Sequence, residues 1–133
     1  MKKYFKKSIS VLMSFCILAF SNVTLASTSK ADTISVGSTC GVCTLTGTSS
    51  SVTAVTLKNS GTAVNLSVTL YSYEHSIVSP STIKTQSGND NDTLRAEIST
   101  SADTSYSYYF ARSAHKLMTT SGSSEITLSI SLS

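Results

Sequence analysis

Two cysteines separated by two residues form the most distinctive chemical spacing in the chain. Cys40 and Cys43 flank Gly41-Val42, and a Cys-x-x-Cys motif can form a disulfide, exchange thiols or bind zinc. In a straight strand their Cα atoms would lie about 10 Å apart, at ~3.3 Å per residue. A disulfide does not span Cα atoms much more than ~7 Å apart. A Cys40–Cys43 disulfide therefore requires a turn at Gly41-Val42, where Gly suits the first central position of a type II′ hairpin.

This hairpin also agrees with burial, because it places Ile34 and Leu45 on the same face as both cysteines. We therefore predict a structural hairpin disulfide, as expected in an oxidising extracellular compartment. The redox alternative needs a helix N-terminus at the first cysteine, and no helical pattern follows Cys43. A zinc site would have to recruit His75 and His115 from distant parts of the sequence. Free thiols are the remaining alternative.

Four tyrosines form the second candidate site. Tyr71 and Tyr73 have the strand parity opposite to the aliphatic residues that precede them, so they should point away from the core. Tyr106 and Tyr108 lie in a second aromatic segment. Exposed tyrosines can stack on sugars or anchor a protein interface with little loss of side-chain entropy. We treat these four tyrosines as a candidate binding face, with cross-strand packing within the sheet as the alternative.

No residue pattern predicts catalysis. Ser, His and Asp all occur, but the chain lacks a Gly-x-Ser-x-Gly element, and we expect His75 and His115 to be ordinary surface histidines. The segment Gly88–Asp92 lacks the spacing and the distal Glu of an EF-hand, so we expect a polar turn there. We predict no catalytic residue, no metal and no cofactor, and keep a small hydrolase or redox enzyme as the alternative.

The N-terminus has the three parts of a signal peptide. Four lysines among the first seven residues precede an apolar run over 9–20, and small residues precede possible cleavage sites after Ala26 and after Ala31. Twelve residues rise about 18 Å as a helix, less than the ~30 Å hydrocarbon core of a membrane. We expect 1–26 to be a signal peptide and 27–133 to be one secreted, extracellular domain. An uncleaved membrane anchor is the alternative.

The net charge of +3 comes from this leader. Four of the ten basic residues lie in it, which leaves six against seven acidic residues, a net charge of −1. Nucleic acid and anionic membranes both attract a basic patch, so we expect neither as a partner of the processed chain. The remaining length suffices for one domain with one modest core.

Apolar residues alternate with Ser and Thr at period two in several segments, and no segment has helical periodicity. The expected strands are 33–40, 43–48, 51–58, 63–73, 81–86, 93–100, 104–118 and 124–132. Short strands with frequent turns predict an all-β fold. We expect a single antiparallel β-sandwich of immunoglobulin-like type with 7–8 strands, with a closed barrel as the alternative.

The most regular alternation lies on both sides of Ser60-Gly61. We expect a hairpin there, with Leu57 opposite Val64 and Val55 opposite Leu66. This segment resembles the early hairpin of many bacterial immunoglobulin-like domains, which often carry an Asn-x-Gly turn between two alternating strands. The resemblance covers about sixteen residues. It implies the sandwich fold and an adhesive or structural role, and it transfers no functional residue.

Two later segments refine the expected sheets. Segment 105–118 has aromatic residues on both parities, which indicates a central strand or one curved by a bulge. The last strand, Ile126–Leu132, alternates strictly and could pair at its edge with another copy or a partner.

We therefore expect a small non-enzymatic protein with a structural or adhesive role at or outside the cell envelope, with a cell-surface protein or glycan as candidate partner. The alternative is a secreted antimicrobial protein, because Tyr106–His115 resembles a Tyr/His-bearing stretch of small bacteriocins of the lactococcin type. The near-neutral processed charge argues against a cationic membrane-lytic mechanism.

Overall fold

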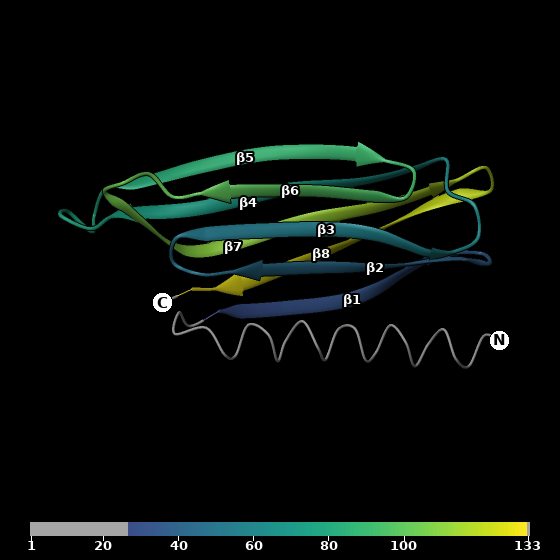
Figure 1. Cartoon of the computed structure of the whole chain (residues 1–133), viewed down its shortest axis with the longest axis horizontal. Helices are drawn as coiled ribbons and strands as arrows, with labels where there is room; N and C mark the ends of the chain where they lie inside the picture. Colours follow the sequence, from purple (N-terminus) through teal and green to yellow (C-terminus); the bar gives the residue numbers. More distant parts are fainter. Residues whose placement is uncertain (1–26, 133) are drawn as a thin grey trace.

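The computed structural model describes residues 27–132, which form eight antiparallel strands in two sheets (Figure 1). The strands are β1 (Thr28–Val36), β2 (Thr39–Gly47), β3 (Ser51–Ser60), β4 (Asn65–Ser76), β5 (Ile83–Asp92), β6 (Arg95–Ser101), β7 (Tyr106–Thr119) and β8 (Gly122–Ser131). The first sheet has the order β1-β2-β3-β6 and the second has the order β5-β4-β7-β8. The two sheets pack as a β-sandwich, which confirms the predicted all-β class.

The signal peptide expected at 1–26 lies outside the described residues. Within 27–132, no helical segment has the length and apolar character needed to cross a membrane.

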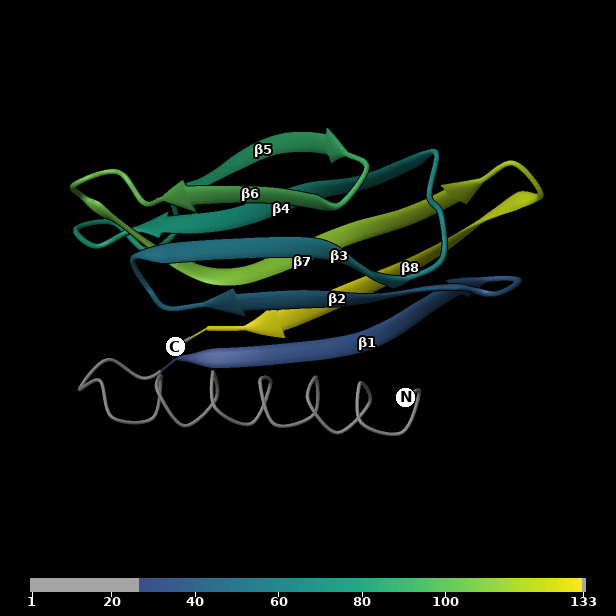
Figure 2. The same cartoon turned by 45° about the vertical axis from the view of Figure 1, so that its right-hand side comes forward.

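The chain changes sheet three times, after β3, after β5 and after β6. The two sheets also meet along both sides, where β5 lies beside β6 and β1 lies beside β8 (Figures 1 and 2). At the first of these sides the Asp90 carboxylate of β5 accepts the backbone N–H of Glu97 on β6 at 2.9 Å. The sandwich is therefore nearly closed around its core.

The core lies between the inner faces of the sheets, and it follows the alternation seen in the sequence. Leu66, Val68 and Leu70 of β4 are fully buried, and Val52 and Ala54 face them from β3. The alternating residues of the last strand that lie on the inner face are Leu128, Ile130 and Leu132, with Ile126 partly buried beside them. Period-two burial thus specifies which side of each of these strands is inside.

The segment around Ser60-Gly61 crosses from one sheet to the other, so the predicted hairpin is wrong. β3 pairs with β2 and β6, whereas β4 pairs with β5 and β7. Leu57 therefore does not pair with Val64, nor Val55 with Leu66, and Leu57 and Val64 are 36% and 51% exposed. Alternation identifies the side chains that share a face, but two alternating strands can meet either side by side or across the core.

The first hairpin turns at Gly37-Ser38, and the predicted turn at Gly41-Val42 is wrong. Gly37 has a φ of +58°, in the left-handed region that glycine adopts without strain. Gly41 lies inside β2, where a Cβ would come within 2.8 Å of the Leu57 carbonyl oxygen. Glycine at position 41 therefore serves close packing against β3 and not a reversal of the chain.

The segment Gly88–Asp92, predicted as a polar turn, is instead the second half of β5. The turn follows it, where the Asp92 carboxylate accepts the backbone N–H groups of Leu94 at 3.0 Å and Thr93 at 2.6 Å. These hydrogen bonds, that of Leu94 first, hold the pKa of Asp92 below its usual value. Polar composition indicated a turn near this position but not its exact start.

Candidate interaction surface

The outer face of the second sheet carries a cluster of aromatic side chains on β4 and β7. We call it the aromatic face, and its members are Tyr71, Tyr73, His75, Tyr109, Phe110 and Arg112. The Tyr73 ring centroid lies 5.5 Å from that of Phe110 and 6.4 Å from that of Tyr109. His75 lies 5.8 Å from Tyr109. These tilted contacts form one continuous aromatic surface.

Arg112 extends this surface along the sheet. Its guanidinium carbon lies 4.8 Å from the centroid of the Tyr71 ring, and the two residues are cross-strand partners. Such a cation–π contact fixes both side chains and leaves guanidinium N–H groups free to act as donors. Arg112 is exposed, whereas the aromatic rings of the face are half-buried.

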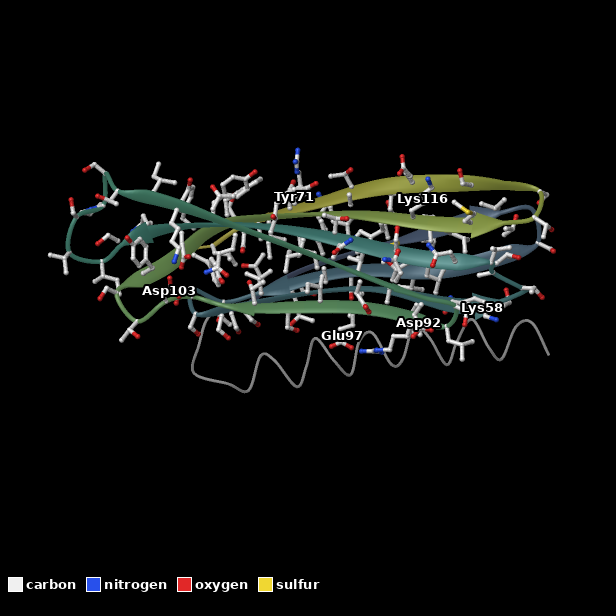
Figure 3. The ribbon with its side chains drawn as sticks, turned by 90° about the horizontal axis from the view of Figure 1, so that it is seen from above. Lys58, Tyr71, Asp92, Glu97, Asp103 and Lys116 are labelled. Carbon is white, nitrogen blue, oxygen red and sulfur yellow. The ribbon has the colours of Figure 1, made fainter. Side chains whose placement is uncertain are left out.

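The strand parity of β4 explains why Tyr71 and Tyr73 point outward. Leu70, Ser72 and Glu74 are all buried on the inner side, so the tyrosines between them occupy the outer side. Figure 3 shows Tyr71 and Lys116 projecting from one broad side of the molecule and Glu97 from the opposite side. The predicted orientation of Tyr71 and Tyr73 thus agrees with the structure.

A β-bulge adds a further aromatic ring to the face. Tyr73 pairs with Phe110 and Glu74 pairs with Tyr108, so Tyr109 is an extra residue without a partner on β4. Strand β7 is also central, between β4 and β8. Aromatic residues on both parities of 105–118 predicted either a central strand or one curved by a bulge, and β7 has both features. The predicted binding face left out Tyr109 and Phe110, although the same signal could have identified both as members of the surface.

Tyr108 and Tyr106, the other two tyrosines of the predicted binding face, lie elsewhere. Tyr108 is 1% exposed and belongs to the core, where its hydroxyl lies 2.9 Å from Thr100 Oγ1. Tyr106 lies near one end of the sandwich, with Lys84 Nζ 5.4 Å from its ring centroid. The bulge at Tyr109 places Tyr106 and Tyr108 on the inner side of β7, opposite to Phe110, so these two tyrosines are not continuous with the aromatic face.

The predicted Cys40–Cys43 disulfide is not found, and both residues are free thiols. They lie on opposite faces of β2, because Cys43 is fully buried on the inner side and Cys40 is a half-exposed neighbour of Ser35 on the outer side. The reason is the position of the turn at Gly37, which leaves the motif inside a strand. Burial, with a smaller effect of Asp32, raises the pKa of the Cys43 thiol to about 12.

His115, expected at the surface, is instead buried at the centre of the sandwich. Its Nδ1 lies 2.8 Å from Thr56 Oγ1 on the opposite sheet, and its Nε2 lies 2.6 Å from Ser113 Oγ. Thr56 Oγ1 donates to the carbonyl of Ser67 at 3.0 Å, so it accepts from Nδ1–H, and Nε2 then accepts from Ser113. Burial lowers the pKa of His115 to about 4, so the imidazole is neutral.

The predicted zinc alternative would combine both cysteines with both histidines, and the structure separates them. His75 belongs to the outer aromatic face, whereas His115 and Cys43 lie inside the sandwich. Across residues 27–132, no three His, Cys, Asp or Glu side chains gather closely enough to hold a metal ion.

No protein-family model matches the chain, and no curated protein is significantly similar to it in sequence.

Proposed function

We propose that the protein is a secreted, non-enzymatic binding module that attaches to an extracellular glycan through the aromatic face. The observation that carries this proposal is the continuous arrangement of Tyr73, Tyr109 and Phe110 with the Arg112–Tyr71 pair on the outer face of one sheet. Flat aromatic rings can pack against the C–H faces of pyranose sugars, and tyrosines do so with little loss of entropy.

Rows of hydroxyl side chains flank the rings and support a sugar as ligand. Thr85 and Ser87 of β5 are the register partners of Tyr73 and Tyr71, and all of these residues face outward. On the other side of β7, the partners of Phe110 and Arg112 are Ser131 and Ser129 of β8. These hydroxyls can donate and accept hydrogen bonds, as the hydroxyls of a polysaccharide require.

The charges of this surface favour a neutral glycan. Lys116 has Glu125 as its cross-strand partner, so these opposite charges balance. Arg112 then supplies the remaining positive charge, and its guanidinium is held over Tyr71. A surface with so little net charge has no electrostatic preference for a polyanion or an anionic membrane.

We further propose that the sandwich is of immunoglobulin-like type. In that fold, strands B and E pair in one sheet and strands C, F and G pair in the other. The pairs β3–β6, β4–β7 and β7–β8 fit B–E, C–F and F–G, with β5 as an additional strand next to C. Tyr108 at the start of β7 also resembles a tyrosine corner, although its hydroxyl meets the Thr100 side chain instead of a backbone group.

The non-enzymatic part of the proposal is supported by the position of His115. A Ser–His pair at 2.6 Å has the spacing of a nucleophile and its base. Ser113 and His115 are 0% and 1% exposed, and residues of both sheets enclose them. A substrate would have to separate the sheets to reach these groups, so the pair is suited to holding the core together.

A binding measurement with purified protein tests the proposal. We expect retention on one or more insoluble neutral polysaccharides, and loss of binding by about tenfold or more in a Tyr71→Ala/Tyr73→Ala variant, at ~1 kcal/mol for each lost stacking contact. The matched control is Val55→Ala/Leu57→Ala, which removes two outward apolar side chains from the central strand of the first sheet.

Equal binding by both double variants and the wild type, with circular dichroism showing an intact sheet, would contradict the proposal. Binding to protein-coated surfaces that the same tyrosine variant abolishes would assign the face to a protein partner instead. Growth-inhibition assays on neighbouring species would detect the alternative antimicrobial role.

A further inference from the structure

We propose that Lys84 and Asp103 become joined by an intramolecular amide bond between their side chains, and that Glu74 assists its formation. This covalent site lies on the inner side of β4 and β5, opposite to the aromatic face, and does not depend on the proposed glycan binding. The proposal starts from a cluster at one end of the sandwich, where β4, β5 and the loop between β6 and β7 converge (Figure 3, Asp103).

Lys84 lies between two carboxylates. Its Nζ contacts Asp103 Oδ2 and lies 4.0 Å from Glu74 Oε1. Among the lysines of residues 27–132, Lys84 is the one whose amine lies within ion-pair distance of a carboxylate. The Tyr106 ring, 5.4 Å from Nζ at its centroid, covers another side of the amine. An amine nucleophile and a carboxyl electrophile are therefore already in contact.

Glu74 is the unusual member of this cluster, because its carboxylate is fully buried. Oε1 accepts a hydrogen bond from Gln86 Nε2 at 2.7 Å, and Oε2 accepts one from the backbone N–H of Asp103 at 3.3 Å. Burying a carboxylate is costly, and a surface ion pair between Lys84 and Asp103 does not require it. Its position suits a proton relay, since one oxygen faces the amine and the other holds the Asp103 backbone.

The strand register fixes this geometry before any reaction. Glu74 and Lys84 are direct partners in the β4–β5 pair, so their side chains leave the sheet on the same side. The backbone N–H of Tyr106 donates to the Asp103 carbonyl at 2.9 Å, which closes the loop that carries Asp103. Groups held in such a near-attack arrangement react as if at effective concentrations of ~10⁵–10⁸ M. That advantage lowers the barrier to an amide condensation that is very slow between free molecules in water.

The reaction balances without any co-reactant. A proton first passes from the Lys84 ammonium to the Asp103 carboxylate within the ion pair, which leaves a free amine and a carboxylic acid. The amine attacks Cγ of Asp103, and the new C–N bond gives a tetrahedral intermediate. Glu74 takes a proton from the nitrogen and returns it to the departing hydroxyl, as a general base and then a general acid. The C–O bond breaks, one water molecule leaves, and nothing is oxidised or reduced. Each chain reacts once, so the step is a self-modification and not turnover of a substrate.

Mass spectrometry of the purified full chain tests the proposal. We expect the wild type to lack one water molecule relative to the mass of its sequence, corrected for any N-terminal processing, and Lys84→Arg to show no such loss. Trypsin cannot cleave after an acylated Lys84, so its digest should contain a branched peptide that joins 59–95 to 96–112. Separate peptides 59–84, 85–95 and 96–112 from folded wild-type protein would overturn the proposal.

Two conservative variants test the chemistry itself. Asp103→Asn should form the same branched peptide with loss of ammonia, because the amide nitrogen is then the leaving group. Glu74→Gln keeps the shape and the hydrogen-bonding capacity but cannot relay the proton, so it should yield folded protein without the branched peptide. Loss of water in the wild type at any other position, without the branched peptide, would count against the assignment.

Discussion

His115 and Thr56 link the two sheets through the centre of the core, with 2.8 Å between the ring Nδ1 and the threonine hydroxyl. The bond joins β7 to β3, strands from different sheets. Thr56 and His115 are both buried, and each has a further partner, Ser67 and Ser113 respectively. A fully satisfied polar network of this kind makes the relative position of the sheets specific, and it makes the core sensitive to protonation.

We predict that the protein loses stability in acid because of His115. Its folded-state pKa is lowered to about 4 by burial, below the ~6.5 expected in the unfolded chain. Between these values the unfolded chain binds more protons, so the free energy of unfolding falls as the pH falls, by up to ~3 kcal/mol near pH 4. Above about pH 6.5 this histidine contributes no pH dependence. Urea unfolding across this range measures the effect.

The control for the acid prediction is the second histidine. His115→Gln should flatten the pH dependence in this window, whereas His75→Gln, on the half-buried outer face, should retain it. An unchanged slope in His115→Gln would assign the acid sensitivity to other groups.

We predict that the two thiols differ sharply in reactivity. Cys40 is half-exposed and should be alkylated in the folded protein, whereas Cys43 is buried with its pKa raised to about 12 and should react only after unfolding. Alkylation with and without denaturant, followed by fragmentation of the peptide that carries both residues, measures this difference. A mass that rises on reduction, with both thiols then reacting equally, would restore the disulfide.

We predict that alanine variants of Tyr108, in the core, and Tyr71, on the surface, lose very different amounts of unfolding free energy. Tyr108→Ala removes a buried ring and should lower the free energy of unfolding by ~3–5 kcal/mol. Tyr71→Ala removes a half-exposed ring and its contact with Arg112, so the expected cost is about 1 kcal/mol or less. Denaturant titration of both variants under the same conditions gives the comparison. Similar losses would mean that Tyr71 is also part of a packed layer.

The proposed amide bond should stabilise the fold by closing a covalent ring across Lys84 and Asp103. By analogy with a disulfide that closes a loop of about twenty residues, the ring contributes ~3 kcal/mol. Lys84→Arg retains the positive charge but cannot form the bond, so it should lower the melting temperature by roughly 10–20 °C. Arg95→Lys, in the exposed pair with Glu97, is the matched control and should have little effect. A Lys84→Arg protein as stable as the wild type would contradict this expectation.

Strand content was the part of the fold that the sequence determined best. Eight strands were expected and residues 27–132 form eight, because alternating apolar residues and Thr-rich composition both favour strands. The inner faces of β4 and β8 were also predicted, since their large aliphatic residues occupy a single parity. In β3 the large residues Val55 and Leu57 lie outside and Val52, Ala54 and Thr56 inside, so residue size pointed to the wrong face.

Strand connections and the composition of the surface depended on information that no local pattern carries. Whether the chain at Gly61 forms a hairpin or crosses between sheets is decided by the pairing of β3 with β6 and of β4 with β7, both distant in sequence. Gly41 and Gly37 suit a turn equally well in isolation, and only the close approach of Leu57 shows which one is needed inside a strand. The residue at which β7 bulges, Tyr109, is likewise determined by the register against β4.

The two flanks of the sandwich, where an edge strand of one sheet lies beside an edge strand of the other, determine how other molecules can approach it. The Asp90 carboxylate accepts a backbone N–H at the edge of β6, and β1 runs alongside β8, the last strand, for which edge pairing was predicted. Another polypeptide that added a strand to either sheet at these edges would first have to displace these neighbouring strands. Binding is thereby directed from the rims to the broad surfaces of the sandwich, and edge-to-edge association of neighbouring copies is disfavoured.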